Sequence, residues 1–256
     1  MKPRSLGRSF ALAIALAFSS AGNLALAQQN AQADAPAIEP DAMAALQRMK
    51  AALRALNTFS LRAATTIDEV TDDGMKLQFG GTITMMVKRP NGLRAEVDSD
   101  RKRRQFIYDG NTFTVYGPRA GGYYASVAAP PTLKAMADAI DSKYGIRLPL
   151  TDLFYWAAGD EAVPIKEAAL IGPSRIGKVM CDHVAVRQEG LDWQVWIAQG
   201  KQALPQKIVI TTLSEPSQPQ YVSEIQWNTS PKFDANTFKF VAPKGAQPIK
   251  IVEIEK

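Results

Sequence analysis

The stretch that most constrains the fold is residues 177–200, with the sequence GKVMCDHVAVRQEGLDWQVWIAQG. It contains two runs rich in Val, Trp and Ile, which are separated by Glu189 and Gly190. β-Branched and aromatic residues favour strands, and a short turn that contains glycine favours a hairpin between them. The stretch therefore predicts two neighbouring strands of an antiparallel sheet.

Alternation of apolar and polar residues extends this prediction along most of the chain. From Phe59 to Ile67 the residues alternate in this way until an Asp-Asp-Gly turn at residues 72–74, which indicates a long strand. Further runs of strand length are separated by short loops of Gly, Asn and Asp, which favour antiparallel neighbours. We expect these strands at residues 77–88, 93–97, 105–108, 112–116 and 123–127, then a second series within 165–227 and a closing strand at 249–254.

Helical spacing interrupts this pattern in two places. Asp41 can cap a helix in which Leu46, Met49 and Leu53 lie on one apolar face. Residues 130–144 begin with Pro-Pro-Thr, which suits the first turn of a helix, and continue with a second apolar face; an apolar and aromatic piece follows at 150–156. The predicted fold class is α+β: a large curved antiparallel sheet, or open barrel, with an N-terminal helix and a helical lid on its concave side.

The first 27 residues have the three regions of a secretory signal peptide. Basic residues precede an apolar run at 10–18, and Ala-Leu-Ala at 25–27 precedes the expected cleavage after Ala27. The apolar run is shorter than the roughly 20 residues that span a bilayer, and no later segment reaches that length. No cysteine lies near the cleavage site to accept a lipid. We therefore expect a soluble periplasmic protein with no transmembrane segment after cleavage.

Charge and composition limit the kinds of partner and domain. After the leader, the chain has 27 basic and 25 acidic residues. It thus lacks the dense basic surface of nucleic-acid-binding proteins, and we expect no nucleic acid as a partner. Residues 28–40 are rich in Gln, Ala and Pro and predict a flexible linker. The remaining part, residues 41–256, has about 215 residues and is long enough to bury the core of a single β-rich domain.

Cys181 and His183 are the candidates for catalysis, since the chain has one cysteine and one histidine. On a strand they face the same side, so a thiolate and imidazole pair is geometrically allowed, whereas Asp182 faces the opposite side and leaves no orienting carboxylate. A free cysteine is most often a small buried hydrophobe. A single histidine also excludes multi-histidine zinc sites. We expect no enzyme activity, no metal and no cofactor, and keep a Cys/His-dependent enzyme as the least favoured alternative.

Two groups of residues are candidates for binding. Arg101, Lys102, Arg103 and Arg104 form a basic cluster between two predicted strands, which can contact a lipid headgroup or an acidic partner surface. The chain also has more aromatic area than the surface of a thin sheet protein needs, and its methionines suit a lining that adapts to varied lipids. An apolar pocket beneath the lid would be lined by Leu133, Met136, Ile140, Tyr144, Phe154, Trp156, Trp193 and Met85. The alternative is that these side chains fill an ordinary core.

Several short motifs resemble a bacterial family of predicted periplasmic proteins of unknown function. The motifs are Tyr108-Asp109-Gly110, Tyr123-Tyr124, Cys181-Asp182-His183, Asp192-Trp193-Gln194-Val195-Trp196, Pro205 with Ile208-Val209-Ile210, Pro219-Gln220-Tyr221 and Trp227-Asn228. That family is similar in architecture to the Lol lipoprotein carriers, in which helices cover the hydrophobic hollow of an open, curved antiparallel sheet. The resemblance implies the same fold for this chain. The Lol carriers also have a functional arginine on an early strand, and no local motif distinguishes Arg62 from Arg94 as its counterpart.

These observations favour a periplasmic carrier or sensor, without enzyme activity, for a lipid, a lipoprotein acyl chain or another amphiphile. The alternative is an envelope protein-interaction module, in which an exposed strand edge or the basic cluster recognises a protein partner. The two hypotheses predict different interiors for the domain. A carrier needs an open apolar hollow, whereas the interaction module has a filled core.

Overall fold

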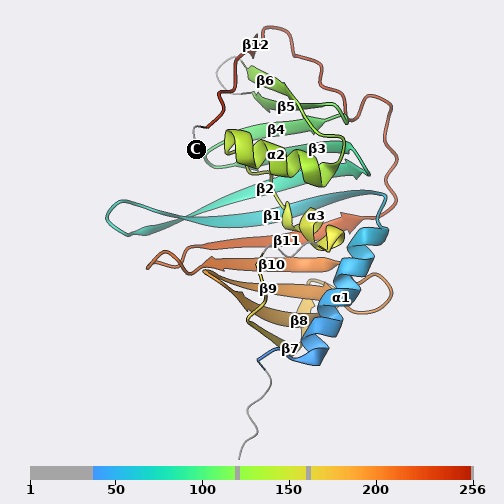
Figure 1. The fold of residues 1–256 in the computed structure, drawn as a ribbon, viewed down its shortest axis with the longest axis vertical. Helices are drawn as coiled ribbons and strands as arrows, with labels where there is room; N and C mark the ends of the chain where they lie inside the picture. Colours follow the sequence, from blue (N-terminus) through green and yellow to red (C-terminus); the bar gives the residue numbers. More distant parts are fainter. Residues whose placement is uncertain (1–36, 119–121, 160–162, 255–256) are drawn as a thin grey trace, which may run out of the picture. The chain divides into compact units, whose positions relative to one another are not determined.

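The computed structural model describes residues 37–118, 122–159 and 163–254. These residues form three helices and one sheet of twelve strands in the order β12-β6-β5-β4-β3-β2-β1-β11-β10-β9-β8-β7 (Figure 1). The strands are β1 Thr58–Val70, β2 Lys76–Lys88, β3 Gly92–Ser99, β4 Arg103–Tyr108, β5 Thr112–Gly117, β6 Tyr123–Ala128, β7 Glu167–Ile176, β8 Val179–Gln188, β9 Leu191–Ala198, β10 Pro205–Thr212, β11 Gln220–Asn228 and β12 Gln247–Pro248. The sheet is curved and open, which confirms the predicted fold class. The expected signal peptide and residues 28–36 of the expected linker lie outside the described residues.

Most neighbouring strands of the sheet are consecutive in the chain and joined by short connections, which makes them antiparallel, and the distant strands β1 and β11 also pair antiparallel. The stretch 177–200 forms β8 and β9, which pair from Cys181 with Ala198 to Gln188 with Leu191. Gly190 lies at their turn with a φ of 67°, a conformation that other residues rarely adopt. Within the named strands, only the two-residue β12 pairs in parallel, with β6. The hairpin predicted from residues 177–200 is therefore confirmed.

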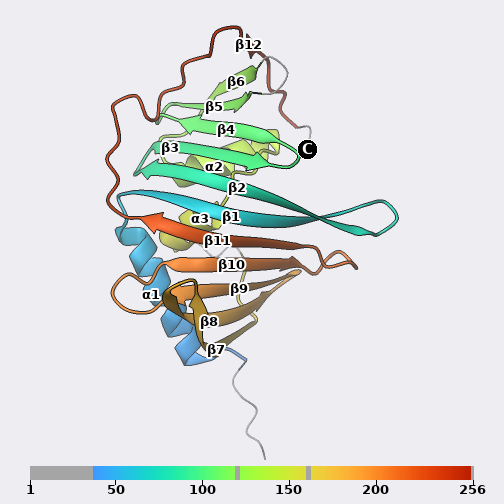
Figure 2. The same cartoon turned by 180° about the vertical axis from the view of Figure 1, so that it is seen from behind.

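The three helices lie on one face of the sheet. They are α1 Pro40–Ala55, α2 Leu133–Tyr144 and α3 Asp152–Ala158. Thr132 caps α2 by accepting a hydrogen bond from the backbone N–H of Ala135, and Gly145 ends the helix with a φ of 63°. All three helices are in front of the sheet in Figure 1 and behind it in Figure 2, so no helix of the described residues covers the other face of the sheet.

The space between the helices and the sheet is filled by one hydrophobic core. Alternation along each strand directs every second side chain toward the helices, and these side chains meet the apolar helical faces. The core includes Leu46, Met49 and Leu53 from α1, Met136 and Ile140 from α2, Leu153 and Phe154 from α3, and Leu61, Met85, Phe113 and Val195 from the sheet, all of them buried. Tight packing of this kind holds the three helices against the sheet.

The N-terminal end of the described chain is paired with the sheet. The carbonyl of Ala37 accepts a hydrogen bond from the backbone N–H of Ala168 in β7. The backbone N–H of Glu39 in turn donates to the carbonyl of Ala168. Residues 37–39 thus lie against β7, and α1 begins at Pro40. The expected start of the linker at residue 28 and the expected single domain at residues 41–256 stay predictions.

The expected closing strand at 249–254 is wrong. The structure has only the two-residue strand Gln247–Pro248 in this region, and residues 249–254 continue without strand structure. Pro248 does not interrupt the pairing, because the backbone N–H groups of Gln247 and Ile249 on either side of it both donate to the segment 122–124, and the pairing with β6 ends at Ile249. The isoleucine-rich end of the chain is therefore a largely irregular segment.

In the described parts of the chain, none of the helices is both long enough and apolar enough to pass through a bilayer.

Candidate functional site

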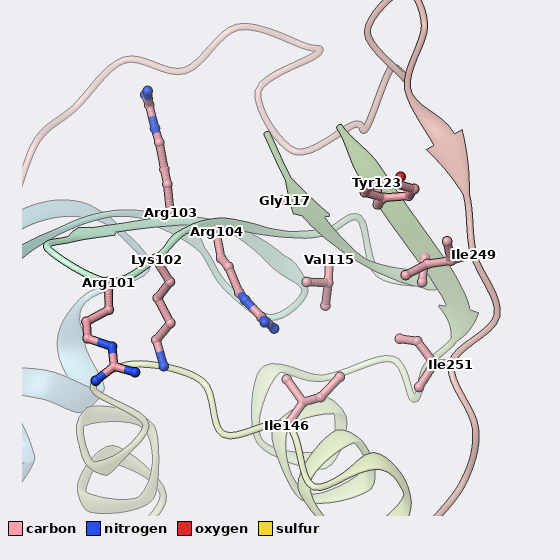
Figure 3. Close-up of a pocket in the computed structure, with 11 residues that line it drawn as sticks. Arg101, Lys102, Arg103, Arg104, Val115, Gly117, Tyr123, Ile146, Ile249 and Ile251 are labelled. Atoms are coloured by element: carbon pink, nitrogen blue, oxygen red, sulfur yellow. The ribbon is translucent and has the colours of Figure 1, made fainter. Parts of the chain in front are cut away.

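A pocket of about 380 Å³ lies beside the β12 edge of the sheet (Figure 3). The backbone around it comes from β4, β5 and β6, from the segment that follows α2, and from the C-terminal segment. One wall is apolar, and the four consecutive residues Arg101, Lys102, Arg103 and Arg104 border the opposite side. We call this site the basic pocket.

The apolar wall is assembled from three separate parts of the chain. Val115 and Ala125 are cross-strand partners in β5 and β6, and they face the helices because Val115 also pairs with the core residue Phe106. Ile146 directly follows the left-handed Gly145 at the end of α2, which turns the chain toward the pocket. The C-terminal segment adds two isoleucines. The wall thus consists of Val115, Ala125, Ile146, Ile249 and Ile251.

The four basic residues do not all point into the pocket. Arg104 pairs with Val97 and so lies on the face of the sheet that carries the helices, whereas Arg103 lies on the opposite face. Figure 3 shows the Arg103 side chain pointing away from the Arg104 side chain, which extends into the space above Ile146. The hydrogen bond from Arg103 Nε to Glu96, at 2.7 Å, raises the pKa of this guanidinium above its ordinary value.

The four basic residues also differ in whether a carboxylate neutralises their charge. Arg101 forms an ion pair with Glu69 at 3.1 Å and lies over the ring of Phe79. No carboxylate of the described residues lies within 4.0 Å of the Lys102 ammonium or of the Arg104 guanidinium. Their positive charge is therefore available to an anionic group in the basic pocket.

The eight residues that the sequence suggested as a ligand lining lie elsewhere. Leu133, Met136, Ile140, Phe154, Trp193 and Met85 are buried in the core, and Tyr144 and Trp156 are partly buried against it. None of them lines the basic pocket. Trp156 and Trp193 stack at 5.2 Å between ring centroids and border a different pocket of about 310 Å³. Their contact with a ligand stays a prediction.

Sequence reasoning found the basic cluster but missed the apolar wall beside it. The sequence pattern predicts a closing strand that contains Ile249 and Ile251, and it does not single out Ile146. The signals that point to them are Gly145, which ends α2 and turns the chain at Ile146, and the alternating isoleucines after Pro248. Neither signal says that these segments meet.

Cys181 and His183 face the same side of β8, as alternation predicts, but their surroundings do not favour nucleophilic catalysis. Burial of Cys181 raises the pKa of its thiol, and the negative charge of Asp182 adds to this effect. His183 Nε2 lies 2.9 Å from Gln194 Oε1, and its ring stacks on Trp196 at 4.0 Å. Asp182 forms an ion pair with Arg48 of α1. Within the described residues, no group of three acidic, cysteine or histidine side chains could hold a metal ion.

Cys181 should therefore react slowly with iodoacetamide. At pH 7.5 the raised pKa leaves little thiolate, and the buried sulfur is inaccessible, so we expect alkylation at least about tenfold slower than in the urea-unfolded chain. Mass spectrometry of timed samples measures both rates. Equal rates in the folded and unfolded protein would contradict this description and revive the Cys/His hypothesis.

The two arginines considered as counterparts of the carrier arginine both lie on the face of the sheet opposite the described helices. Arg62 pairs with Thr84 of β2, and the neighbouring position Leu61 points into the core. The Arg94 guanidinium lies 3.3 Å from the carbonyl oxygen of Thr237, to which it donates. Neither residue lines the basic pocket or the space beneath the helices.

An open antiparallel sheet with helices on one face and a basic pocket at its edge defines a single-sheet α+β protein of the open-barrel kind. The chain belongs to the family described as predicted periplasmic proteins, DUF2092, whose model matches residues 42–252. The family resemblance seen in the sequence motifs is thus confirmed. No curated protein sequence matches the chain.

Several solved structures are similar to this one. LprF from Mycobacterium bovis is 14% identical, with 78% of this chain and 99% of LprF covered and a TM-score of 0.46. The lipoprotein LppX from Mycobacterium tuberculosis is 12% identical, with 77% and 100% covered and a TM-score of 0.46. A LolA-superfamily protein from Nitrosomonas europaea is 9% identical, with 78% and 97% covered and a TM-score of 0.38.

Proposed function

We propose that this protein is a periplasmic carrier or sensor, without enzyme activity, that binds an anionic amphiphile in the basic pocket. The observation that carries this proposal is the meeting of an apolar wall with two cations, Lys102 and Arg104, that have no carboxylate partner among the described residues. The ligand's anionic head lies beside these cations. Its hydrocarbon chain lies against Val115, Ile146 and Ile249, and no bond has to be broken.

The size of the basic pocket limits the ligand. Its volume of about 380 Å³ is near the lower end of the range for ligand pockets, roughly 300–1,000 Å³. The pocket thus holds part of one hydrocarbon chain and leaves the head at the basic side. Because ordering and association costs must be offset, the gain from burying a short chain corresponds to binding at roughly micromolar levels.

Affinity should rise with the length of the hydrocarbon chain and then level off. Each methylene that is buried contributes about 0.8 kcal/mol, which corresponds to about a fourfold change in Kd. Isothermal titration of the mature protein with a series from hexyl to dodecyl phosphate, below their micelle concentrations, measures this slope. A flat series, or no heat of binding at any length, would count against the proposal.

A second candidate function, the envelope protein-interaction module, is favoured by the filled core. The predicted lid residues pack against the sheet, so the interior of the domain needs no ligand. In that case the basic residues at 101–104 recognise an acidic protein surface. Native mass spectrometry of the protein after gentle extraction from its envelope separates the two functions, because a carrier retains lipid and an interaction module retains a protein partner without lipid.

A further inference from the structure

The last described residues, 247–254, cross the basic pocket as a strap between the sheet and a helix. We call this segment the C-terminal strap. Its ends are attached to different elements, to β6 at one end and to the last turn of α2 at the other. The backbone hydrogen bonds run from Gln247 N to Gly122 O (2.9 Å), from Ile249 N to Tyr124 O (2.8 Å) and from Ile254 N to Lys143 O (2.8 Å).

The strap supplies two of the five apolar residues in the pocket wall but buries little surface. Ile249 and Ile251 extend toward the pocket in Figure 3. Ile249 is nevertheless 52% exposed, Val252 80% and Ile254 50%. A segment held by few hydrogen bonds and little apolar burial opens at a low free-energy cost compared with the rest of a fold. The strap therefore forms a pocket wall that can detach while the sheet stays folded.

Upstream of the strap, the ring of Phe240 holds the chain against the sheet, so only the residues after Phe240 take part in the opening. Phe240 packs against two rings of the sheet, Tyr116 at 5.9 Å and Tyr124 at 5.1 Å between centroids. A turn follows, in which the backbone N–H of Ala246 donates to the carbonyl of Pro243 and Gly245 has a φ of 86°. This turn lies between Phe240, which is anchored on the sheet, and the C-terminal strap. It is therefore suited to act as a hinge.

We infer that the C-terminal strap is a gate of the basic pocket, which swings about the turn at residues 243–246 to admit and release the hydrocarbon chain. This inference rests on the proposed function, since it concerns the same ligand at the same site. In the closed position, Ile249 and Ile251 cover the chain of the ligand. In the open position, the side of the pocket between β6 and α2 is accessible.

The gate is tested by the rates at which a fluorescent probe enters and leaves. The probe is cis-parinaric acid, an anionic amphiphile whose polyene chain becomes fluorescent in an apolar site. A truncated variant that ends at Ala246 lacks the strap, and we expect its association and dissociation rate constants in stopped-flow fluorescence to rise at least about tenfold over those of the mature chain. Its affinity falls, because two wall residues are gone.

A second variant closes the gate reversibly and does not depend on the folding of a truncated chain. Lys143→Cys combined with Ile254→Cys places two thiols where the strap meets α2, and neither residue lines the pocket. With the disulfide verified by mass spectrometry, we expect association about tenfold slower than in the same protein after reduction. Unchanged rates in both variants, with the mature chain still binding the probe, would overturn the gate but leave the proposed function standing.

Hydrogen exchange tests the gate without any ligand. We expect the amides of Ile249 and Ile254 to exchange at least about a hundredfold faster than the paired amides of β5, such as Val115. If these amides are as protected as those of β5, the strap does not open and the inference is wrong. If instead the strap amides exchange quickly but the mature chain does not bind cis-parinaric acid, it is the proposed function that fails.

Discussion

Replacing both Lys102 and Arg104 with glutamate is expected to weaken the binding of dodecyl phosphate at least about 30-fold. The two cations line the pocket without a carboxylate partner among the described residues, so the double variant turns two attractions for the headgroup into two repulsions. Calorimetric titration measures the change in Kd. Because both side chains are exposed, the fold should tolerate the substitutions, and the thermal unfolding temperature should change little.

A matched control distinguishes this local effect from a change in net charge. Arg175→Glu with Lys178→Glu reverses two exposed charges at the β7–β8 end, and β7 lies at the opposite edge of the sheet from β6. This control has the same net charge as the test variant, but we expect less than about a twofold change in Kd at 0.15 M salt, because the reversed charges lie well beyond the Debye length. An equal loss of affinity in both variants would show that the basic pocket does not hold the headgroup.

Most of the fold was predictable because its signals are local. The alternation that begins at Phe59, the glycine turn at Gly190 and the apolar face from Leu133 to Tyr144 each act over a few neighbouring residues. Short turns then force antiparallel neighbours, so the chain order alone gives most of the sheet order. The failure at residues 249–254 has the same origin. Isoleucines favour strands, but a strand also needs a partner with free N–H and C=O groups in register.

The candidate site was only half predictable because it combines local and distant features. The basic run was evident, and alternation shows that Arg103 and Arg104 lie on opposite faces of a strand. Which of the two faces the helices depends on the pairing of β4 with β3, where Arg104 meets Val97. Ile146 and Ile249 contribute to the pocket wall only because the segment after α2 and the C-terminal segment lie close together in the fold. The spacing of residues in the sequence does not show that these two segments are close.

The filled interior could not be distinguished from a hollow in the sequence. A helix that covers a cavity and a helix that packs onto a sheet have the same apolar periodicity, since both bury one face. The difference is the distance at which the helix lies from the sheet, and it is set by the fit of many side chains together. Met136 illustrates this, because its place on the apolar face was correctly predicted, whereas its surroundings were not determined by that position.

Met136→Ala and Ile249→Ala are expected to have opposite effects. Met136 is fully buried in the core, so its truncation should lower the free energy of unfolding by about 2–5 kcal/mol, through lost burial and the cavity that remains. The affinity for dodecyl phosphate should stay within about twofold, because Met136 does not line the basic pocket. Ile249 is half exposed and lines the pocket, so its truncation should cost less than about 1 kcal/mol of stability but lower the affinity at least about threefold.

Urea unfolding and calorimetric titration of both variants measure the two quantities, and their comparison decides where the hydrocarbon chain lies. If the hydrocarbon chain lay beneath the helices instead, as the sequence-based hypothesis has it, Met136 would line its site and contact it. The Met136→Ala variant would then lose little stability and much affinity, while Ile249→Ala would bind normally. The expected pattern is the reverse, because the Met136 side chain is fully buried in the core and has no free surface left to offer a ligand.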